Sequence, residues 1–379
     1  MYLTHLHLKS FRNFEDQIFE FGPSFNILVG DNAQGKTNVL EAVSLMCSGA
    51  SFRTSEWRDM ISHGRGVART SVRLESDRGN DELVVELVEP RKRFIKNGKN
   101  TTPGGFSRLH AVLFAPEEIL LLRTQPGARR KFIDNFVSAF VPGYKKLVRD
   151  YSSVVSQRNK ILSDETLTPI ERKLNLLPWN DQLVQLGTKV VVTRHEWTGR
   201  INETLPSHYG AIAIDDEEAK FRYKPHACEE DAAGDVGAVE SSYVEALESR
   251  ARDEWIRGVT LVGPHRDDLV AHIGSGSVKR FASQGQHRSF VLALKVAEME
   301  VYRTITGEEP LLLLDDVASE LDPDRNRRFF DYVRGSRGQV FITTTREADV
   351  KLEPNPHTMR YCIARGSAKK LSGGTAPTR

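Results

Sequence analysis

Eight residues near the N-terminus, "GDNAQGKT" at positions 30–37, match the phosphate-binding pattern G-x-x-x-x-G-K-[ST]. The apolar run "FNILV" precedes them and the stretch "TNVLEAVSLM" follows, so a buried strand and a helix are expected on either side. Gly30 and Gly35 let backbone N–H groups turn inward around phosphate oxygens, and the helix start adds about half a positive charge. Lys36 would neutralise the β- and γ-phosphates, and Thr37 would offer a hydroxyl to Mg²⁺.

This loop therefore predicts a site for ATP with Mg²⁺. The residues expected to line the nucleotide are Gly30, Asp31, Asn32, Ala33, Gln34, Gly35, Lys36, Thr37 and Asn38.

A second group of chemically useful residues ends the apolar run "PLLLLDD". Two adjacent carboxylates at the end of a buried strand are costly unless a metal ion or a polar network receives them. We expect Asp315 to hold Mg²⁺ through water, together with Thr37. We expect Asp316 to orient the attacking water, so that Asp316 and Lys36 are the predicted catalytic residues.

The short polar segment "SQGQ", at positions 283–286, precedes an apolar helical pattern. One interpretation is ordinary helix capping, for which Ser283 or Ser289 would serve. The other interpretation is an anion site, because a serine hydroxyl and the backbone N–H groups at a helix start bind phosphate well. The segment alone leaves both interpretations open.

Strand-like patterns occupy both ends of the chain, and helical patterns occupy the middle. Residues 1–29 and 67–96 contain repeated alternation of apolar and polar residues, and the Asn97-Gly98 pair is a strong signal for a hairpin turn. From residue 117 to about 205 the apolar residues recur with the period of a helix. Buried-strand patterns return in "PLLLLDD" and "QVFITTT". An α/β unit is therefore predicted to be split by a helical insertion.

The predicted organisation follows from these patterns. The acidic, Gly- and Ala-rich stretch 229–239 is expected to be a surface loop, with a helix near 240–256 after it. The expected parts are an ATPase lobe beginning at 1–116, an inserted helical lobe at 117–258, the second part of the ATPase lobe at 259–366, and a flexible tail at 367–379.

Composition is that of a globular protein without a membrane segment. The chain has 379 residues, of which 39% are hydrophobic, and a formal net charge of +2. No apolar run approaches the roughly 18 residues of a membrane span, and the N-terminus lacks the apolar core of a secretion signal. The three cysteines are far apart, which argues against a disulfide framework or a zinc site. A cytoplasmic location and no membrane partner are expected.

Three consecutive cations, Arg129, Arg130 and Lys131, stand at a predicted helix start in "GARRKFID". They could grip DNA phosphates without reading sequence, or they could be an ordinary solvated face. The segment "GPHRDD", at positions 263–268, pairs His265 with two aspartates. It lacks a convincing third metal ligand, so a structural or interface role is preferred.

The phosphate-binding loop, the distant Asp-Asp strand and "SQGQ" before a helix together make the chain similar to the ATP-binding-cassette ATPases. In that superfamily a signature of this type caps a helix and faces the γ-phosphate held by another protomer. The resemblance implies that Ser283, Gly285 and Gln286 contact ATP in an ATP-dependent homodimer. It also implies that Ser319, in "SELD", lies in a loop that crosses the interface.

Six segments in order, "LKSFRNFE", "GDNAQGKTNVLEA", "GARRKFID", "LVGPHRDDL", "SQGQHR" and "LLLLDDVASELD", resemble the RecF family of bacterial DNA-repair ATPases, which is related to the SMC proteins. This resemblance covers nearly the whole chain except the tail. It implies an α/β fold, namely an ATP-binding-cassette-type P-loop ATPase head with a mixed sheet flanked by helices, an inserted helical lobe and no long coiled-coil arm. Arg12 and Asn13 of "FRN" are the implied further nucleotide contacts.

The resemblance also implies a function in recombinational repair, DNA replication and the SOS response to DNA damage. The ATP-bound dimer would bind DNA at single-strand gaps or junctions, independently of sequence. It would promote recombinase loading with recombination mediator proteins of the RecR and RecO type. The implied enzyme is a weak, DNA-stimulated ATPase that acts as a dimerisation switch.

Two departures from the superfamily pattern concern hydrolysis. Asp316 stands where transport ATPases carry Glu, and the shorter side chain favours slow hydrolysis. A His is usual after the strand that follows, whereas this chain has three threonines at 343–345, with Thr344 as the expected counterpart.

Two other functional classes compete with repair. A soluble ATPase subunit of a membrane transporter is the main alternative, but its usual signature differs from "SQGQHR" and a large basic insertion is foreign to it. An SMC-type protein associated with a nuclease would need a long coiled-coil arm, which requires heptads sustained over many turns, and the middle region lacks them.

Overall fold

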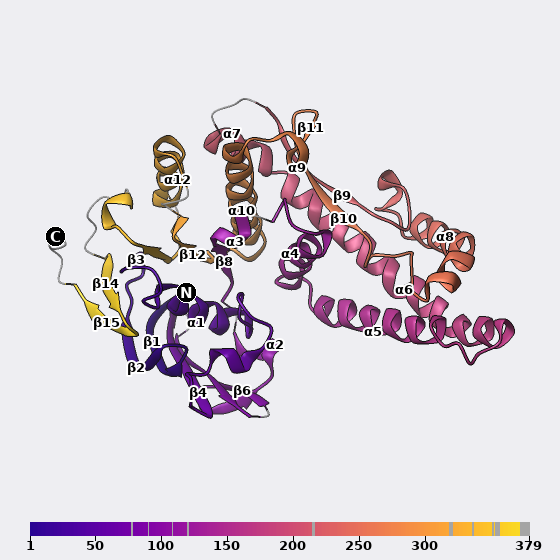
Figure 1. The fold of residues 1–379 in the computed structure, drawn as a ribbon. Coiled ribbons are helices and arrows are strands. Elements are labelled where there is room, and N and C mark those ends of the chain that lie inside the picture. The colour runs from indigo at the N-terminus through magenta and orange to yellow at the C-terminus, as the bar shows by residue number, and fades with distance from the viewer. Residues whose placement is uncertain are drawn as a thin grey trace. The chain divides into compact units, whose positions relative to one another are not determined.

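The computed structural model describes residues 1–76, 79–89, 91–107, 109–119, 121–213, 217–317, 321–335, 337–350, 352 and 357–371. The chain forms two compact units. Residues 1–119 and 298–379 make the first, which we call the split unit, and residues 120–297 make the second, the inserted unit. Figure 1 shows both. None of the described helices is both long enough and apolar enough to cross a membrane.

One part of the split unit is a six-stranded, mainly parallel sheet in the order β15-β14-β3-β13-β12-β8. Its central strands are nearly continuous apolar runs, as expected for strands that are buried on both faces. Helix α1 (Lys36–Ser48) and helix α12 (Pro323–Gly335) lie on opposite sides of these strands (Figure 1). The strands are β3 (Phe25–Val29), β8 (Ala111–Phe114), β12 (Leu311–Asp315), β13 (Val340–Thr344), β14 (Met359–Ala364) and β15 (Ser367–Lys370).

A second sheet of the split unit is antiparallel, in the order β2-β1-β4-β5-β6-β7. Its strands alternate between buried and exposed residues, so one face packs on the core. The predicted hairpin turn is present between β6 and β7, where Asn97 and Gly98 both have positive φ (49° and 75°). The strands are β1 (Tyr2–Phe11), β2 (Phe14–Glu20), β4 (Val67–Ser76), β5 (Gly79–Val88), β6 (Arg91–Lys96) and β7 (Lys99–Thr101).

One apolar core joins the two sheets through α1, whose buried residues contact both. Short helical segments complete the split unit: η1 (Trp57–Met60), α2 (Pro103–Phe106), α3 (Pro116–Ile119) and η3 (Glu347–Asp349).

The inserted unit is mainly helical. Its longest helix, α6, begins at a reciprocal cap in which the Thr168 hydroxyl and the Glu171 side chain each accept a backbone N–H, with Pro169 at the first helical position. A small antiparallel sheet, β11-β10-β9, accompanies the helices. The elements are α4 (Pro126–Ser138), α5 (Tyr144–Leu162), α6 (Pro169–Asn202), α7 (Leu205–Ile212), β9 (Ala219–Lys224), η2 (Glu230–Ala232), α8 (Val236–Arg257), β10 (Asp268–Ile273), β11 (Gly276–Ser277), α9 (Val278–Phe281) and α10 (Gln284–Thr306), whose last turns belong to the split unit.

The predicted fold class, a mixed α/β protein with sheets flanked by helices, is confirmed. The division into units differs from the expected one at its second boundary, which lies after residue 297 rather than after 258. The reason is strand pairing, because β10 pairs along its length with β9 of the inserted unit. Residues 283–286, expected in the ATPase lobe, therefore also belong to the inserted unit.

Two smaller expectations also differ from the structure. The stretch 229–239 is not all loop, because it contains η2 and the first turn of α8, which Asp235 caps by accepting from the N–H of Ala238. A flexible tail was expected from residue 367, but residues 367–370 form β15, which pairs with β14. Residues 372–379 of that tail lie outside the described part of the chain.

Candidate functional site

The predicted phosphate-binding loop connects β3 to α1, and close packing shapes it at both glycines. A Cβ atom on Gly30 would collide with the carbonyl oxygen of Ile363 on β14. Gly35 has a φ of +117°, and a Cβ there would lie 2.7 Å from the side-chain nitrogen of Asn13. Only glycine satisfies both positions without moving the backbone. The loop is therefore built for close approach of a ligand to main-chain N–H groups.

Lys36 lies over this loop. Its ammonium donates to the carbonyl oxygens of Gly30 (2.5 Å) and Asp31 (3.0 Å). Burial lowers the pKa of Lys36, an effect opposed by the nearby carboxylates, of which Asp316 is the strongest. Phosphate oxygens at the loop would favour the charged form and relieve that burial penalty.

The two motifs meet because β3 and β12 flank β13 in one parallel sheet, so their C-terminal ends lie at the same edge. The Thr37 hydroxyl donates to Oδ1 of Asp315 at 2.9 Å, although the two residues are far apart in sequence. The structure thus brings together the predicted hydroxyl and carboxylate. Hard oxygen atoms of this kind are the ligands that Mg²⁺ prefers.

Thr343, on the intervening strand β13, contacts both aspartates, Asp315 at its carboxylate and Asp316 at its backbone N–H. Its hydroxyl is completely buried, donates to Oδ1 of Asp315 at 2.7 Å, and accepts from the backbone N–H of Asp316 at 2.9 Å. Asp316 has a φ of 51°, a left-handed conformation that is unusual for a residue with a side chain. Thr344, the expected counterpart of the His that is usual after this strand, donates its hydroxyl to the carbonyl of Arg346, and that assignment stays a prediction. Successive strand residues face opposite sides, so only one of the two threonines can reach the carboxylates.

Asn13 and Arg12, at the turn after β1, have different roles. The Asn13 amide donates to the carbonyl of Gln34 in the loop (2.9 Å) and accepts from the amide of Asn38 (2.8 Å). Arg12 makes a bidentate ion pair with Glu41, whose side chain is fully buried on α1. Asn13 therefore lies against the loop, whereas the guanidinium of Arg12 braces the turn against α1.

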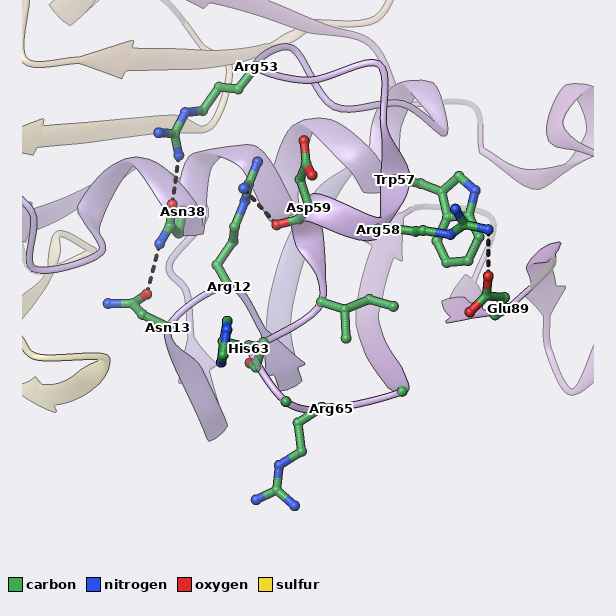
Figure 2. Close-up of a pocket in the computed structure, with 14 residues that line it drawn as sticks. Arg12, Asn13, Asn38, Arg53, Trp57, Arg58, Asp59, His63, Arg65 and Glu89 are labelled. Carbon is green, nitrogen blue, oxygen red and sulfur yellow. Dashed lines mark hydrogen bonds and ion pairs between the residues drawn. The ribbon is translucent and has the colours of Figure 1, made fainter.

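A cavity of about 750 Å³ is lined by Asn13, which donates to the carbonyl of Gln34 in the loop, and by Asn38 of α1. Figure 2 shows a chain of hydrogen bonds from Arg53 to Asn38 (2.8 Å) and on to Asn13. Sequence reasoning identified Asn13 and Asn38, but it missed Arg53, although this arginine stands in the polar segment just after α1. The cavity thus joins the loop through a cation and two amides.

The far wall of this cavity carries an aromatic ring, which sequence reasoning also missed. The Arg58 guanidinium lies over the Trp57 ring, 5.6 Å from its centroid, and is paired with Glu89 (Figure 2). A cavity with an apolar ring and several cations beside a phosphate-binding loop has the chemistry to hold a nucleoside phosphate.

The predicted signature forms a reciprocal helix cap at the start of α10. The Ser283 hydroxyl accepts from the N–H of Gln286 (3.1 Å), and the Gln286 side chain accepts from the N–H of Ser283 (3.0 Å). The capping interpretation therefore applies. It is compatible with phosphate binding, because Ser283 is exposed and its hydroxyl accepts in the cap, leaving its own proton for an anion. Gly285 follows within the same first turn, and Ser319 lies outside the described residues.

The predicted row of DNA-binding cations does not form one surface. Arg129 is only 3% exposed and makes a bidentate ion pair with Asp268, so it cannot be a surface DNA contact. Arg130 is half-buried and donates to the carbonyl of Asp267, and Lys131 is exposed. Consecutive helical residues are rotated by about 100°, so three in a row point in three directions.

The segment at 263–268 is tied into the interior of the inserted unit. Asp267 is fully buried and accepts from Arg194, from the N–H of His226 and from the Tyr223 hydroxyl. His265 lies between the Tyr151 hydroxyl (2.7 Å) and the carbonyl of Thr260 (3.1 Å). These contacts, with the Arg129–Asp268 pair, link α4, α5 and α6 to the start of β10.

Known proteins that resemble this chain belong to one family. Residues 2–361 match the family model described as the RecF/RecN/SMC N terminal domain. The chain is 36% identical to the DNA replication and repair protein RecF of Citrifermentans bemidjiense, an alignment that covers 97% of this chain and 99% of the relative. It is also 36% identical to the protein of the same name from Symbiobacterium thermophilum, with 98% of each chain covered.

Solved structures give the same result. The structure of the recombination mediator protein RecF-ATPrS in the RecFOR pathway has a TM-score of 0.88 and 27% identity, with 98% of both chains covered. The crystal structure of the SmcHead bound to the C-winged helix domain of ScpA has a TM-score of 0.56 and 15% identity, and it shows a shared fold.

Proposed function

Because the chain belongs to the RecF family, we propose that it is an ATP-dependent DNA-binding protein of recombinational repair. The observation that carries this proposal is the meeting of Thr37 and Asp315 beside Lys36, at one edge of the parallel sheet. Repair is favoured over a transporter subunit because relatives that align with nearly the whole chain, the inserted unit included, are DNA replication and repair proteins.

ATP would be held by the loop between β3 and α1, with Lys36 on its terminal phosphates. The residues fit a Mg²⁺ ion, since Thr37 offers a hydroxyl and Asp315 a carboxylate within hydrogen-bonding distance of each other. Bound Mg²⁺ would supply charge neutralisation at the phosphates. The cavity of Figure 2, with Trp57 and Arg53, would receive the nucleoside.

Nucleotide binding would act as a dimerisation switch. The loop of one copy holds ATP, and the capped start of α10 in a second copy closes over it through Ser283 and Gly285. The exposure of Ser283 and the unused proton of its hydroxyl support this arrangement. Asp316 would position water for slow, DNA-stimulated hydrolysis, which resets the dimer.

The dimer would bind DNA at single-strand gaps or junctions without reading sequence. It would promote recombinase loading together with mediator proteins of the RecR and RecO type. The RecFOR pathway named for the structurally similar RecF supports such partners.

Light scattering in the presence and absence of ATP and Mg²⁺ tests the switch. We expect the mass to double with ATP, and we expect Lys36→Ala to prevent this by removing the phosphate contact. Ser283→Arg should also prevent dimerisation while leaving ATP binding to the monomer intact, because the loop and α10 belong to different copies in the dimer. An unchanged mass for the wild type with bound ATP would refute the switch.

A further inference from the structure

The inserted unit contains a cavity of about 380 Å³ between helices α4 and α5. Each lining residue on α4 has another three or four positions away, and so do most of those on α5, so one face of each helix borders the cavity. Val190 and Arg194 of α6, with His265, complete the lining. The α4 and α5 residues are Gly127, Arg130, Lys131, Asp134, Asn135, Ser138, Lys145, Val148, Arg149, Tyr151 and Ser152.

The lining is strongly basic. Five of the fourteen lining residues are lysine or arginine, and one, Asp134, is acidic. Both oxygens of Asp134 accept from Arg194 at 2.9 Å, and Oδ1 also accepts from the Tyr144 hydroxyl. The single carboxylate is therefore neutralised by one of the arginines, and four cations are left around the cavity.

Arg130 is the innermost of these four. It is half-buried, and it donates to a neutral acceptor, the carbonyl of Asp267, at 2.7 Å. Burial lowers the pKa of Arg130, and the adjacent Arg194 lowers it further, while the carboxylates of Asp267, Asp268 and Asp134 oppose the shift without cancelling it. A partly desolvated cation beside a second cation gains strongly from an anion.

The other three cations are exposed at the rim. Lys131 and Lys145 form no ion pair with any carboxylate in the described part of the chain, and Arg149 has only a distant one, 3.8 Å from Asp150. Lys145 and Arg149 are one helical turn apart, about 6 Å along α5. Cations with this separation are suited to contacting two phosphates of one nucleic-acid strand. They are less suited to holding one small anion together.

The cavity offers no ring on which a base could stack. Its aromatic lining residues are Tyr151, which is buried, and His265, which is held between Tyr151 and Thr260. Stacking is the usual means by which proteins hold unpaired bases. The cavity is therefore suited to contacting the sugar-phosphate backbone of a nucleic acid rather than its bases.

We propose that this cavity binds the phosphodiester backbone of duplex DNA, with Lys131, Lys145 and Arg149 at the rim and Arg130 inside. This inference rests on the proposed function and gives its DNA contact a location. DNA would then contact a surface formed by α4 and α5, in place of the three consecutive cations at 129–131. Arg129 takes no part in this contact.

The test compares two charge-reversed variants of the full-length protein. The first is K131E/K145E/R149E at the rim. The matched control is K173E/R252E/R257E, three exposed cations of the same unit that do not line the cavity. Fluorescence anisotropy with a labelled duplex, in ATP and Mg²⁺ and across a salt series, gives the affinity. Light scattering and thermal unfolding of each variant report dimerisation and folding.

We expect the rim variant to bind duplex about 100-fold more weakly than the wild type, and the slope of log K against log salt to fall by about 2.7, for three lost phosphate contacts. The control should change affinity only severalfold. Both variants should fold and form the ATP-dependent dimer as the wild type does.

Other results would overturn the inference. Equal losses in the two variants would show that bulk charge, not this cavity, attracts DNA. Unchanged duplex affinity in the rim variant, together with lost binding of inorganic phosphate or a nucleotide, would assign the cavity to a small anion. A rim variant that fails to fold would be replaced by Lys131→Gln with Arg149→Gln. A wild type that binds no DNA would contradict the proposed function itself, whatever the variants do.

Discussion

At the scale of single residues, the candidate site depends on hydroxyl groups as much as on charges. Oδ1 of Asp315 accepts from two threonines, Thr37 and Thr343, which approach from different elements. The same Thr343 hydroxyl accepts the N–H of Asp316, which holds that residue in its left-handed conformation. One side chain therefore contacts both aspartates that the proposed reaction uses, Asp315 at its carboxylate and Asp316 at its main chain.

Thr343→Val should show this role. Valine has the shape of threonine but lacks the hydroxyl, so the carboxylate of Asp315 loses a donor and the N–H of Asp316 loses its shorter bond. We expect kcat for ATP hydrolysis to fall about tenfold and the Mg²⁺ requirement to rise, with a loss of about 1–2 kcal/mol in unfolding free energy. Steady-state kinetics over a Mg²⁺ series measures the first two.

Thr343→Ser is the control for that variant, because it keeps the hydroxyl. It should restore the Mg²⁺ dependence, and ATP binding measured without Mg²⁺ should be the same in all three proteins. A valine variant with wild-type kinetics would remove Thr343 from the site.

At the scale of elements, strand order explains why the site forms. The β3-β13-β12 arrangement brings the loop after β3 and the carboxylates after β12 to one edge. The neighbouring strand β14 sets the path of the loop, since its Ile363 carbonyl faces Gly30 so closely that no side chain fits. The geometry of the loop thus depends on a strand more than 300 residues further along the chain.

Gly30→Ala should therefore disturb two elements together. The added methyl group must push β14 away from the end of β3, so we expect a destabilisation of roughly 1–3 kcal/mol and at least tenfold weaker ATP binding. Urea unfolding and nucleotide titration measure these effects.

Gly199→Ala is the matched control, because Gly199 lies within α6 and a Cβ there would meet nothing within 4 Å. It should leave ATP binding unchanged and stabilise the protein by up to about 1 kcal/mol, since alanine favours a helix. Equal behaviour of the two variants would show that the contact with Ile363 is unimportant for the loop.

At the scale of the whole molecule, nucleotide binding and DNA binding are assigned to different units of the chain. The split unit carries the loop and the carboxylates, and the inserted unit carries the basic cavity and the capped start of α10. In the proposed dimer each copy contributes both. Dimerisation would therefore double the number of basic cavities available to one DNA molecule.

This doubling predicts how salt affects DNA binding. With ATP and Mg²⁺ the slope of log K against log salt should be about twice the slope without nucleotide, because about twice as many counterions are released. Anisotropy titrations at several salt concentrations measure both slopes, and Lys36→Ala should keep the shallow slope in either condition. Equal slopes for the wild type would show that the two binding events are not coupled through dimerisation.

The sequence by itself determined the features that are local. The loop at 30–37, the Asp-Asp pair, the Asn97-Gly98 hairpin and the class of the fold follow from residue types at short spacing, since glycine conformation, strand burial and helix periodicity are properties of neighbouring residues. Thr37 and Asp315 could be paired before the structure, because each belonged to a recognisable motif.

Only the tertiary structure decided what depends on packing between distant segments. It placed β10 beside β9, buried Arg129 against Asp268, and brought the hydroxyl of Thr343 to the carboxylate of Asp315. It also formed a basic cavity from residues of α4, α5 and α6 that no single motif contains. The three neighbouring cations at 129–131 look equivalent in the sequence. The rotation of the helix and the position of the Asp268 carboxylate make Arg129 internal, whereas Lys131 is exposed.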